Sequence, residues 1–570
     1  MHKLISSRIT RILFFVLFLF LLLSFRLFSV QFSASKPLTK LATDQYRTYV
    51  CLLPKRGVVY DYKLRELAVS INLNSIYLDP HIVEDKEFAA GELSSVLDME
   101  RDEILELLKQ NKRFIWLARK VQPEVEISVR KLGIKGVGFI KEPHRVYPNG
   151  TLASHIVGFV GLDDTGLEGI ELVFDRYLKG TVGWRYSIRD AKRQEVPGYE
   201  YREIPPADGN DIILTLDSVI QAIAERELDR AYEKYNAKGG TIIVMDPYKG
   251  DILALASRPT YDPNKINDSK PEARRNRAIS DFFEPGSSFK IVTASAILEE
   301  GVVSVEDELF CENGEFKWGR HTYHDHKPHG WLSFGDVIKY SSNIGTMKAA
   351  IKLGDNRFYR YIKRFGFGKR TGIDLPGEVE GIIRPPSTWS KLSLCSISMG
   401  QELTVTPLQL ACALSGIANG GRYVKPRIID RIQDKSGHVI ERFEPKKMNR
   451  VVSEETATQM RKILRRVVEG GTGRFAEIKG YFPAGKTGTA QKIENGTYSH
   501  RNFMASFIGF LPYDKPKFVV VVIIDEPRPQ YYGGVVAAPV FKKVADQVMR
   551  YYKIEPYVDS DESTVASLAH

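Results

Sequence analysis

An apolar run bounded by basic residues opens the chain. Residues 12–30 are apolar apart from two serines and one arginine. This length, roughly 19 residues, is about what a helix needs to cross the hydrocarbon core of a bilayer. Three basic side chains precede the run: Lys3, Arg8 and Arg11. The positive-inside rule therefore predicts that residues 1–11 stay in the cytoplasm and that the chain beyond an anchor at 12–31 is exported.

A cleaved signal peptide is the alternative interpretation of this run. The segment from Gln31 to Ser35 lacks a convincing small-residue cleavage site, and the apolar stretch is long for a signal. No second apolar segment of similar length follows in the sequence. We therefore predict a single-pass protein of the inner (cytoplasmic) membrane whose large remainder is periplasmic.

Residues 32–205 combine charged helical patterns with closely spaced glycines. Helices are predicted over 86–97 and 99–109, and glycines recur at positions 158, 161, 166 and 169. Such glycines indicate turns with positive φ and close backbone approaches. The region has no nucleophile–base pair and no metal-ligand spacing, and we expect its lone His155 to make a structural hydrogen bond. We predict a non-catalytic, elongated α+β pedestal.

Residues 206–553 follow the order strands, helices, strands. Apolar periodicity and turn residues predict a strand at 211–216, a helix from the Asp217 cap to about Lys234, a hairpin of 240–246 with 251–256, helices to about 474, strands at 503–510 and 518–524, and a helix at 538–551. This order favours an antiparallel sheet flanked by helices over a βαβ repeat, so the predicted fold class is α+β. Residues 554–570 form an acidic tail.

Composition changes this picture little. A chain of 570 residues is long enough for two or three domains. The net charge of +11 is spread among alternating acids and bases, whereas nucleic-acid binding would need a clustered basic face. The four cysteines make no C-x-x-C motif and no disulfide framework, although the sequence leaves one oxidised pair open: Cys51, Cys311, Cys395 and Cys412.

The candidate chemistry begins at a Pro-Gly pair. Residues 285–286 end one segment, and an apolar, helix-like run follows, which places Ser287 at a predicted helix N-terminus. Lys290 lies three residues later, on the same helix face. A hydroxyl nucleophile and a candidate base therefore meet at a positive helix end. Taken alone, S-x-x-K is a common pattern that more often marks an N-cap serine followed by a solvated lysine.

A second motif, S-x-N, lies between two helix-like stretches. It consists of Ser341 and Asn343 with Ser342 between them. The Ser341 hydroxyl can relay a proton to a leaving amine, and the Asn343 side chain can bind a substrate amide.

A third motif of small residues is predicted to be an edge strand. Gly488 would let a substrate lie alongside the strand, while Lys486 and the hydroxyls of Thr487 and Thr489 suit a carboxylate. Lys486 would also help to depress the pKa of a buried Lys290. The backbone N–H groups of residues 287 and 489 would form an oxyanion hole.

This ordered trio of motifs is the signature of penicillin-binding proteins and serine β-lactamases. Along nearly its whole length the chain resembles a class B penicillin-binding protein, with similar stretches at 56–61, 145–158 and 400–409. The stretches at 507–512 and 532–541 resemble the division-type branch of that family. One departure is the segment 60–65, where the family usually carries Asp-Arg-Asn-Gly, which leaves the local turn open.

The resemblance implies a serine β-lactamase/transpeptidase-like domain at 206–553 on a penicillin-binding protein dimerisation domain at 32–205. It implies peptidoglycan D,D-transpeptidation during septal wall synthesis, through an acyl-enzyme on Ser287, and acylation of that serine by β-lactams. It implies Lys290 and Ser341 as further catalytic residues and Asn343, Lys486, Thr487, Gly488 and Thr489 as substrate-binding residues. No cofactor or metal is expected. Glycan strands would come from an FtsW-type glycosyltransferase, among other division proteins.

Several alternatives stay open beside this interpretation. An elongation-type transpeptidase is the nearest, and a carboxypeptidase or a β-lactam-sensing protein is more remote. The pedestal and anchor argue against a secreted β-lactamase, and a sensor would need more membrane spans.

Two further patterns point to other chemistry. Residues 480–487 match a P-loop, but the strand and helix that such a loop needs are missing around them. Four histidines crowd one loop near Asp325 and could bind zinc, although no standard ligand spacing is met: His321, His324, His326 and His329.

Overall fold

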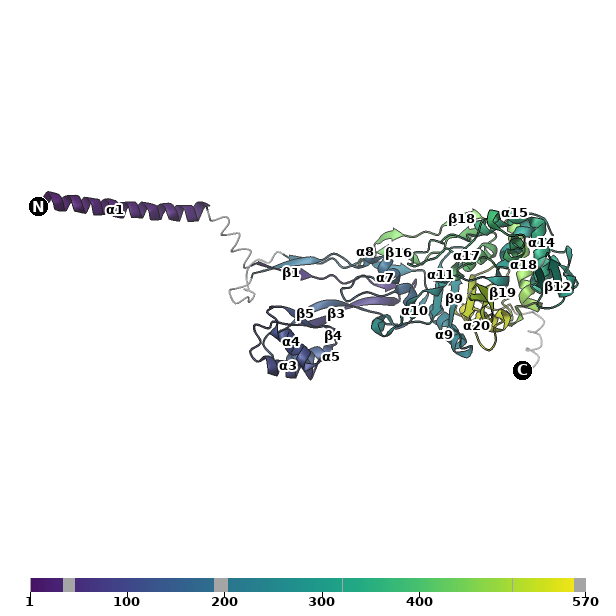
Figure 1. The fold of residues 1–570 in the computed structure, drawn as a ribbon, viewed down its shortest axis with the longest axis horizontal. Coiled ribbons are helices and arrows are strands. Elements are labelled where there is room, and N and C mark those ends of the chain that lie inside the picture. The colour runs from purple at the N-terminus through teal and green to yellow at the C-terminus, as the bar shows by residue number, and fades with distance from the viewer. Residues whose placement is uncertain (1, 34–46, 189–202, 320, 495, 558–570) are drawn as a thin grey trace. The chain divides into compact units, whose positions relative to one another are not determined.

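The computed structural model describes residues 2–33, 47–188, 203–319, 321–494 and 496–557. The predicted acidic tail lies outside the described residues from position 558 onward. Figure 1 shows the ribbon with its elements labelled. The chain divides into two units. One comprises Met1–Lys55 and Gly180–Asp208, and the other comprises Arg56–Lys179 and Gly209–His570.

The first unit contains the predicted anchor. Helix α1 (His2–Phe28) is followed by a short π-helix at Ser29–Ser33. Within the described residues, one helix is long and apolar enough to cross a membrane, at Ile5–Phe32, with a mean hydropathy of 2.6 and no buried part. This unit also holds a three-stranded antiparallel sheet in the order β1-β6-β7, built from β1 (Arg47–Leu52), β6 (Gly183–Ile188) and β7 (Glu203–Ile204).

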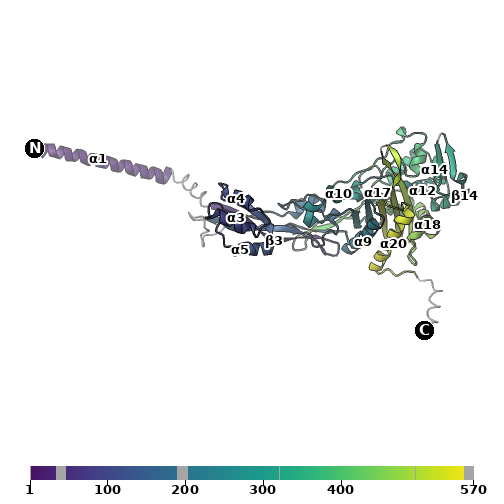
Figure 2. The same ribbon diagram turned by 60° about the horizontal axis from the view of Figure 1, so that its bottom comes forward.

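The second unit begins with a long ribbon in the pedestal sequence. Strands β3 (Glu66–Leu78) and β5 (Val137–Val146) pair antiparallel from Val69–Val146 to Leu78–Val137. Strand β4 (Ile115–Val121) pairs with the distal half of β3, and three helices pack there around a small apolar core (Figure 2). These helices are α3 (Lys86–Ser94), α4 (Arg101–Lys109) and α5 (Pro123–Lys131). The α+β pedestal prediction is confirmed for these residues.

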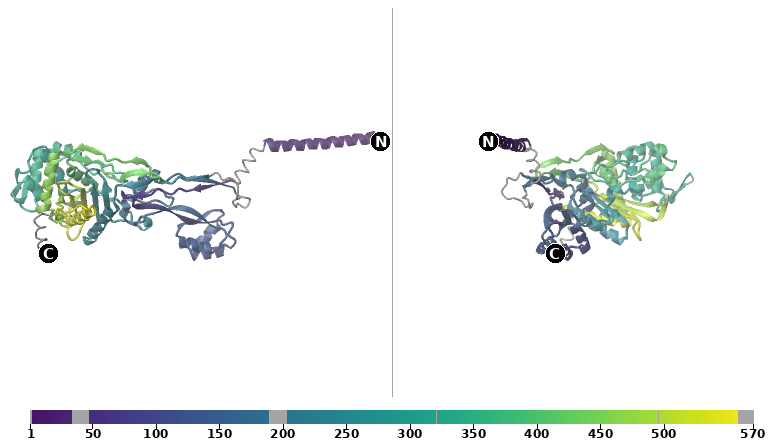
Figure 3. Two further views of the ribbon diagram at one scale, coloured as in Figure 1. Left: turned by 180° about the vertical axis from the view of Figure 1, so that it is seen from behind. Right: turned by 60° about the vertical axis from the view of Figure 1, so that its left-hand side comes forward.

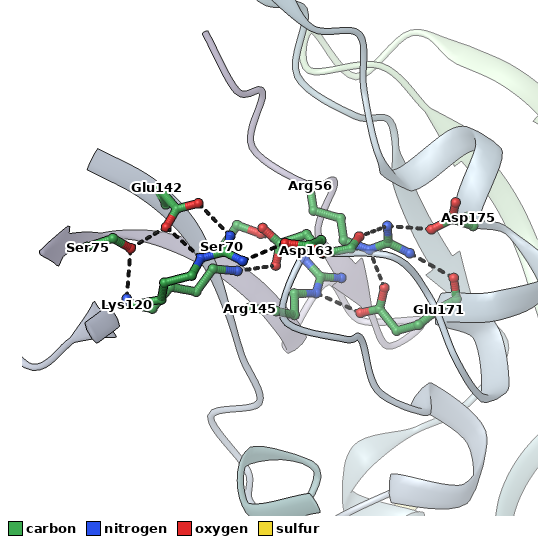
Figure 4. Close-up of polar contacts among 11 residues, drawn as sticks. Arg56, Ser70, Ser75, Lys120, Glu142, Arg145, Asp163, Glu171 and Asp175 are labelled. Carbon is green, nitrogen blue, oxygen red and sulfur yellow. Dashed lines mark hydrogen bonds and ion pairs between the residues drawn. The ribbon is translucent and has the colours of Figure 1, made fainter. Parts of the chain in front are cut away.

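A buried ion-pair network holds the base of this ribbon. Glu171 is fully buried and accepts hydrogen bonds from Arg56 Nε and Arg145 Nε, each over 2.6 Å (Figure 4). Arg56 also reaches Asp175 over 2.7 Å. Arg56 and Arg145 come from two of the stretches that resemble the family, and Glu171 follows the glycines at 158–169, so one carboxylate from a third stretch balances two buried guanidiniums.

Further along the ribbon, a second group of polar contacts reaches strand β4. Arg119 binds Glu142 over 2.7 Å, and Ser75 donates to the same carboxylate (Figure 4). Lys120 binds Asp164 over 3.0 Å. Because β4 follows α4, these contacts attach the helical end of the pedestal to the loop that precedes Glu171.

The turn that the sequence left open is organised by one buried carboxylate. Asp61 accepts from the N–H groups of Lys63 and Arg65 over 2.8 and 2.9 Å, which closes the turn. Its other oxygen accepts from the Ser218 hydroxyl over 2.7 Å. Ser218 is the first residue of helix α9 (Ser218–Lys234), so this turn joins the pedestal sequence to the next domain.

A sheet with both parallel and antiparallel pairs also joins the pedestal sequence to the next domain. Strand β8 (Asp211–Leu214) pairs in parallel with β2 (Val59–Tyr60) and antiparallel with β16 (Ile429–Gln433). The buried ring of His155 donates to the Ala273 carbonyl over 2.8 Å. The structural role predicted for His155 is therefore confirmed.

The central sheet of the second unit has five antiparallel strands in the order β10-β9-β21-β20-β19. These are β9 (Gly239–Met245), β10 (Ile252–Arg258), β19 (Ala484–Glu494), β20 (Thr497–Leu511) and β21 (Phe518–Asp525). Figure 3 gives two further views of the ribbon, in which this unit can be followed by its colours. Alternate residues of β21 enter two different cores: Val520 and Val522 pack with α9 and α20 (Ala538–Tyr551), whereas Val521 packs on the opposite face. The period of two explains why this strand is apolar throughout.

The predicted α+β class, the helix from Ser218 and the hairpin are all confirmed. The helices of the other face include α12 (Lys290–Glu299), α17 (Pro407–Ala418) and α18 (Glu454–Gly470). The remaining helices are α6 (Ser154–Val157), α7 (Gly169–Val173), α8 (Asp175–Leu178), α10 (Pro271–Arg274), α11 (Arg277–Ser280), α13 (Phe334–Lys339), α14 (Asn343–Leu353), α15 (Asp355–Arg364), α16 (Ser393–Ser398) and α19 (Gly533–Val536). The remaining strands are β11 (Glu308–Phe310), β12 (Glu315–Trp318), β13 (His321–His324), β14 (Trp331–Ser333), β15 (Arg422–Val424), β17 (Val439–Arg442) and β18 (Lys447–Arg450).

The four cysteines are unpaired. Three of them are buried and only Cys51 is exposed. The oxidised pair that the sequence left open is therefore absent from this structure.

Candidate active site

The first motif lies in a tight turn in front of helix α12. Gly286 has φ +52°, and its N–H donates to the Gly400 carbonyl over 3.0 Å. Residues Gly286–Phe289 form a 3₁₀ turn, and the α-helix itself begins at Lys290. The α-helix therefore begins about one turn later than the start at Ser287 that the sequence predicted. The tighter turn leaves Ser287 half-buried and directs Lys290 into the core of the domain.

The second motif lies in a strained loop between α13 and α14. Ser341 has φ +63°, a left-handed conformation that a residue with a side chain adopts only when its surroundings impose it. Asp325 supplies that constraint. Its carboxylate accepts from the Asn343 N–H and the Ser342 hydroxyl, each over 2.5 Å, and from the Ile344 N–H over 3.0 Å. The carboxylate therefore caps α14 and holds the loop.

The third motif is an edge strand, as predicted. Strand β19 pairs only with β20 among the described strands, so its other edge faces the turn at Gly286. A Cβ at position 488 would lie 2.3 Å from Ser506 Oγ and 2.9 Å from Ser288 Oγ. Gly488 is therefore needed for the first and third motifs to lie against each other.

One hydroxyl joins the three motifs. Lys486 Nζ donates to Ser341 Oγ over 2.9 Å, and Lys290 Nζ lies 3.4 Å from the same oxygen. Lys290 also donates to the Ser341 carbonyl and to Asn343 Oδ1, each over 2.8 Å. The structure thus brings together four of the predicted site residues. No hydrogen bond joins Ser287 Oγ to either lysine within the described part of the chain.

Both lysines are fully buried, and burial governs their protonation. Desolvation lowers the pKa of Lys290 to about 7, although the charge of Asp325 opposes this effect. Burial, together with the neighbouring Lys290, lowers the pKa of Lys486 well below its usual range. At neutral pH the pair therefore contains an amine that can accept a proton, as the sequence predicted, with burial as the larger cause.

The two predicted threonines have different surroundings. Thr487 Oγ1 lies 2.8 Å from Thr472 Oγ1, in the loop after α18. Thr489 Oγ1 accepts from the Gly533 N–H over 3.0 Å, at the start of α19. Thr489 is only half-buried, so its hydroxyl and backbone lie at the edge of the site, whereas Thr487 is nearly enclosed.

The histidine loop contributes backbone and rings to this region. The His324 carbonyl accepts from Asn343 Nδ2 over 3.0 Å. His326 and His329 pack on Tyr532 and Tyr340, with ring centroids 4.9 and 5.2 Å apart. Within the described residues, no three His, Cys, Asp or Glu side chains are arranged to hold a metal ion.

Sequence reasoning missed two residues that position the site. Asp325 was noted only as a neighbour of the histidines, yet it fixes the S-x-N loop. Gly400 has φ +83°, and a Cβ there would lie 2.2 Å from the Gly286 carbonyl. The signal for Gly400 was its place in the 400–409 stretch, whereas the contact of Asp325 with residues 17 to 19 positions later had no local signal.

Comparison with known proteins defines the class. The model of the penicillin-binding protein transpeptidase domain matches residues 240–546, and that of the penicillin-binding protein dimerisation domain matches residues 52–214. The chain therefore belongs to the penicillin-binding protein transpeptidase family, and it is a serine-type D,D-transpeptidase of that family.

Relatives align along most of the chain. Stage V sporulation protein D of Bacillus subtilis is 35% identical over 97% of this chain and 87% of the relative. The peptidoglycan D,D-transpeptidase FtsI of Escherichia coli K12 is 33% identical over 88% of this chain and 84% of the relative. Among solved structures, penicillin-binding protein 3 of Mycobacterium tuberculosis with aztreonam has a TM-score of 0.70 and 29% identity, covering 89% of this chain and 98% of that one.

Proposed function

We propose that this protein cross-links peptidoglycan stem peptides during cell division, with Ser287 as the nucleophile. The observation that supports this best is the convergence of two buried amines, Lys290 and Lys486, on the Ser341 hydroxyl beside the turn that carries Ser287. A buried amine with a lowered pKa and a second buried lysine next to a serine turn suit acyl transfer through a serine ester.

Acylation follows from these groups. Ser287 Oγ attacks the carbonyl carbon of the penultimate D-Ala of a donor stem, and its proton passes to the neutral amine of Lys290. The N–H groups of Ser287 and Thr489 bind the oxyanion. The proton reaches the leaving nitrogen through Ser341 Oγ, which contacts both lysines, and D-Ala departs.

Deacylation reverses the proton flow. The side-chain amine of an acceptor stem attacks the ester carbonyl carbon, Ser287 Oγ leaves, and the proton lost by the amine returns to that oxygen. Asn343 and Gly488 bind the peptide, while Lys486, Thr487 and Thr489 bind the donor's carboxylate. A penicillin would enter the same ester-forming step and remain attached.

The proposal also includes the membrane topology of the protein, its domain bounds and its partner. The basic residues before the apolar run support a cytoplasmic N-terminus and a periplasmic transpeptidase domain (proposed as 206–553) on a pedestal (proposed as 32–205). An FtsW-type glycosyltransferase would supply glycan strands, recruited through the anchor and the pedestal.

The enzymatic proposal is tested with the full chain in detergent, a pentapeptide donor and an amine acceptor. Wild type should release D-Ala and form the cross-linked product, and Ser287→Ala should do neither. Release of D-Ala without a cross-linked product at saturating acceptor would instead indicate a carboxypeptidase.

The cellular role has a second candidate. Stage V sporulation protein D aligns over 97% of this chain, against 88% for FtsI, which supports a sporulation-specific transpeptidase. Depletion separates the roles. Filamentation with septal localisation supports division, rounding supports elongation, and normal growth with defective spores supports the second candidate.

A further inference from the structure

A cavity of about 370 Å³ opens beside the serine turn. This volume is within the range of small-ligand sites. Its walls come from the residue three before Ser287, from the segments around 382–384 and 402–404, and from the β19–β20 hairpin. The lining side chains used below are Glu284, Arg384, Glu402, Ile493 and Tyr498.

One carboxylate in this cavity is incompletely satisfied. Glu284 is 8% exposed, and its Oε1 accepts from the Glu402 N–H over 2.8 Å and from the Tyr498 hydroxyl over 3.3 Å. Its Oε2 has no hydrogen-bond partner among the described residues. Burial raises the pKa of Glu284, and a buried carboxylate with an unused oxygen is costly. The terminal torsion of a glutamate is broad, so either oxygen can turn toward a ligand.

The charge of the cavity favours a cation. Its lining includes two carboxylates and one guanidinium, and that guanidinium is already engaged, since Arg384 binds Glu402 over 2.7 Å. Glu402 accepts from Ser393 over 2.7 Å as well. Glu284 is therefore the carboxyl group of this cavity that has no cationic partner among the described residues, and an ammonium group beside it would favour its charged form.

The direction of strand β19 indicates which ammonium this is. A donor stem lying along the edge strand places its leaving carboxylate at Lys486 and Thr487 and its scissile carbonyl at Thr489. The part of the donor that precedes the scissile bond then extends the other way, toward Ile493, which lines the cavity. The four residue steps from Thr489 to Ile493 span roughly 13 Å, and one backbone residue plus an extended diamino side chain reaches about 10 Å, so the ammonium group would enter the cavity before it reached Ile493.

We propose that this cavity binds the side-chain ammonium of the donor residue that precedes the two D-alanines, with Glu284 as its counter-ion. The inference rests on the proposed function, in which stems carry a diamino residue because the acceptor attacks through a side-chain amine. Donor and acceptor stems belong to the same polymer, so the donor carries that amine too. The cavity thus selects donors by the charge of this side chain.

The test uses the full-length enzyme in detergent with three donors and a fixed excess of glycinamide as acceptor. The donors are Nα-acetyl-L-lysyl-D-alanyl-D-alanine, the same peptide acetylated on the side chain, and its glutamate counterpart. The predicted order of kcat/KM for D-Ala release is lysine, acetyl-lysine, glutamate, with roughly a tenfold step for the lost charge-assisted contact. Equal values for the three donors in an enzyme that releases D-Ala would overturn the inference and leave the proposed function intact.

Two variants test whether Glu284 causes the difference in kcat/KM between the donors. Glu284→Gln should bring the ratio between lysine and acetyl-lysine donors close to one, and an unchanged ratio contradicts the assignment. Glu494→Gln is the matched control, because Glu494 is exposed on the same hairpin and is not among the residues lining the cavity; its ratio should match wild type. If Glu284→Gln does not unfold cooperatively, it is not properly folded, and the order of kcat/KM among the three donors with the wild-type enzyme then decides whether the inference holds. No D-Ala release from any donor, together with no penicillin labelling, refutes the proposed function itself.

Discussion

Lys486 on strand β19 donates to Ser341 Oγ over 2.9 Å, which connects the edge strand to the loop between α13 and α14. Lys290 lies 3.4 Å from the same oxygen. Two buried amines flanking one hydroxyl cannot both be charged without strong repulsion. The arrangement therefore keeps an acceptor for the Ser287 proton and a route for that proton in one place.

The lowered pKa of Lys290 predicts a pH dependence of acylation. The neutral amine is the base, and its pKa is about 7, so the rate of acylation by a fluorescent penicillin should rise from pH 5 and level off above 8. Below pH 7 the rate should fall roughly tenfold per pH unit. Stopped-flow or gel-based rates across pH 5 to 9 measure this. A rate that is flat over that range, or that falls as pH rises, excludes Lys290 as the base.

Asp325 should act as a positioning residue. Its charge raises the pKa of Lys290, so Asp325→Asn should shift the acylation profile to lower pH while lowering the plateau roughly 10- to 100-fold as the loop loosens. Glu315→Gln, an exposed carboxylate on the adjacent hairpin, is the control and should behave as wild type. A plateau loss without any shift of the profile would mean that Asp325 serves only the fold.

Gly488→Ala should separate the strand from the serine turn. The new Cβ would meet Ser506 Oγ at 2.3 Å and Ser288 Oγ at 2.9 Å, and overpacking of this kind costs about 1–3 kcal/mol. We expect a lower Tm and slow acylation by penicillin. Gly330→Ala is the matched control, since its Cβ would meet nothing closer than 3.6 Å. Wild-type acylation by Gly488→Ala would refute this packing argument.

Glu171→Gln should destabilise the pedestal. It removes the counter-charge of two buried guanidiniums, Arg56 and Arg145, and breaking such a buried network costs about 3–5 kcal/mol. Denaturant unfolding measures the loss. Glu84→Gln breaks the exposed pair with Lys135 and should change stability by less than about 0.5 kcal/mol. If the two variants lost similar amounts of unfolding free energy, the buried network would contribute no more to stability than an exposed ion pair.

Local patterns predicted most of the elements but few of the long-range contacts. The helix from Ser218, the hairpin around 246–251 and the alternation in β21 depend on caps, turns and periods of a few residues, and these were confirmed. The parallel pairing of β2 with β8 joins residues about 150 positions apart, which no local pattern encodes. The 3₁₀ turn at Ser287 was missed because it depends on the contact of Gly286 with Gly400, which is also far away in the sequence.

The same contrast between local patterns and long-range contacts holds for the candidate active site. Motif order predicted which residues would meet, and the structure brings Lys290, Ser341, Asn343 and Lys486 together. The left-handed backbone of Ser341 was beyond prediction, because it depends on Asp325 from another loop. Such strain arises from tertiary contacts, which override the preference of the serine itself.

The proposed acyl transfer depends most directly on Ser287 as the acylated residue. Incubating the full-length protein with a penicillin and mapping the adduct by mass spectrometry of its peptides tests this claim. We predict one covalent penicilloyl group, on the peptide that contains Ser287, and no adduct in Ser287→Ala. An unlabelled wild type, or an adduct that persists in Ser287→Ala, would contradict the account.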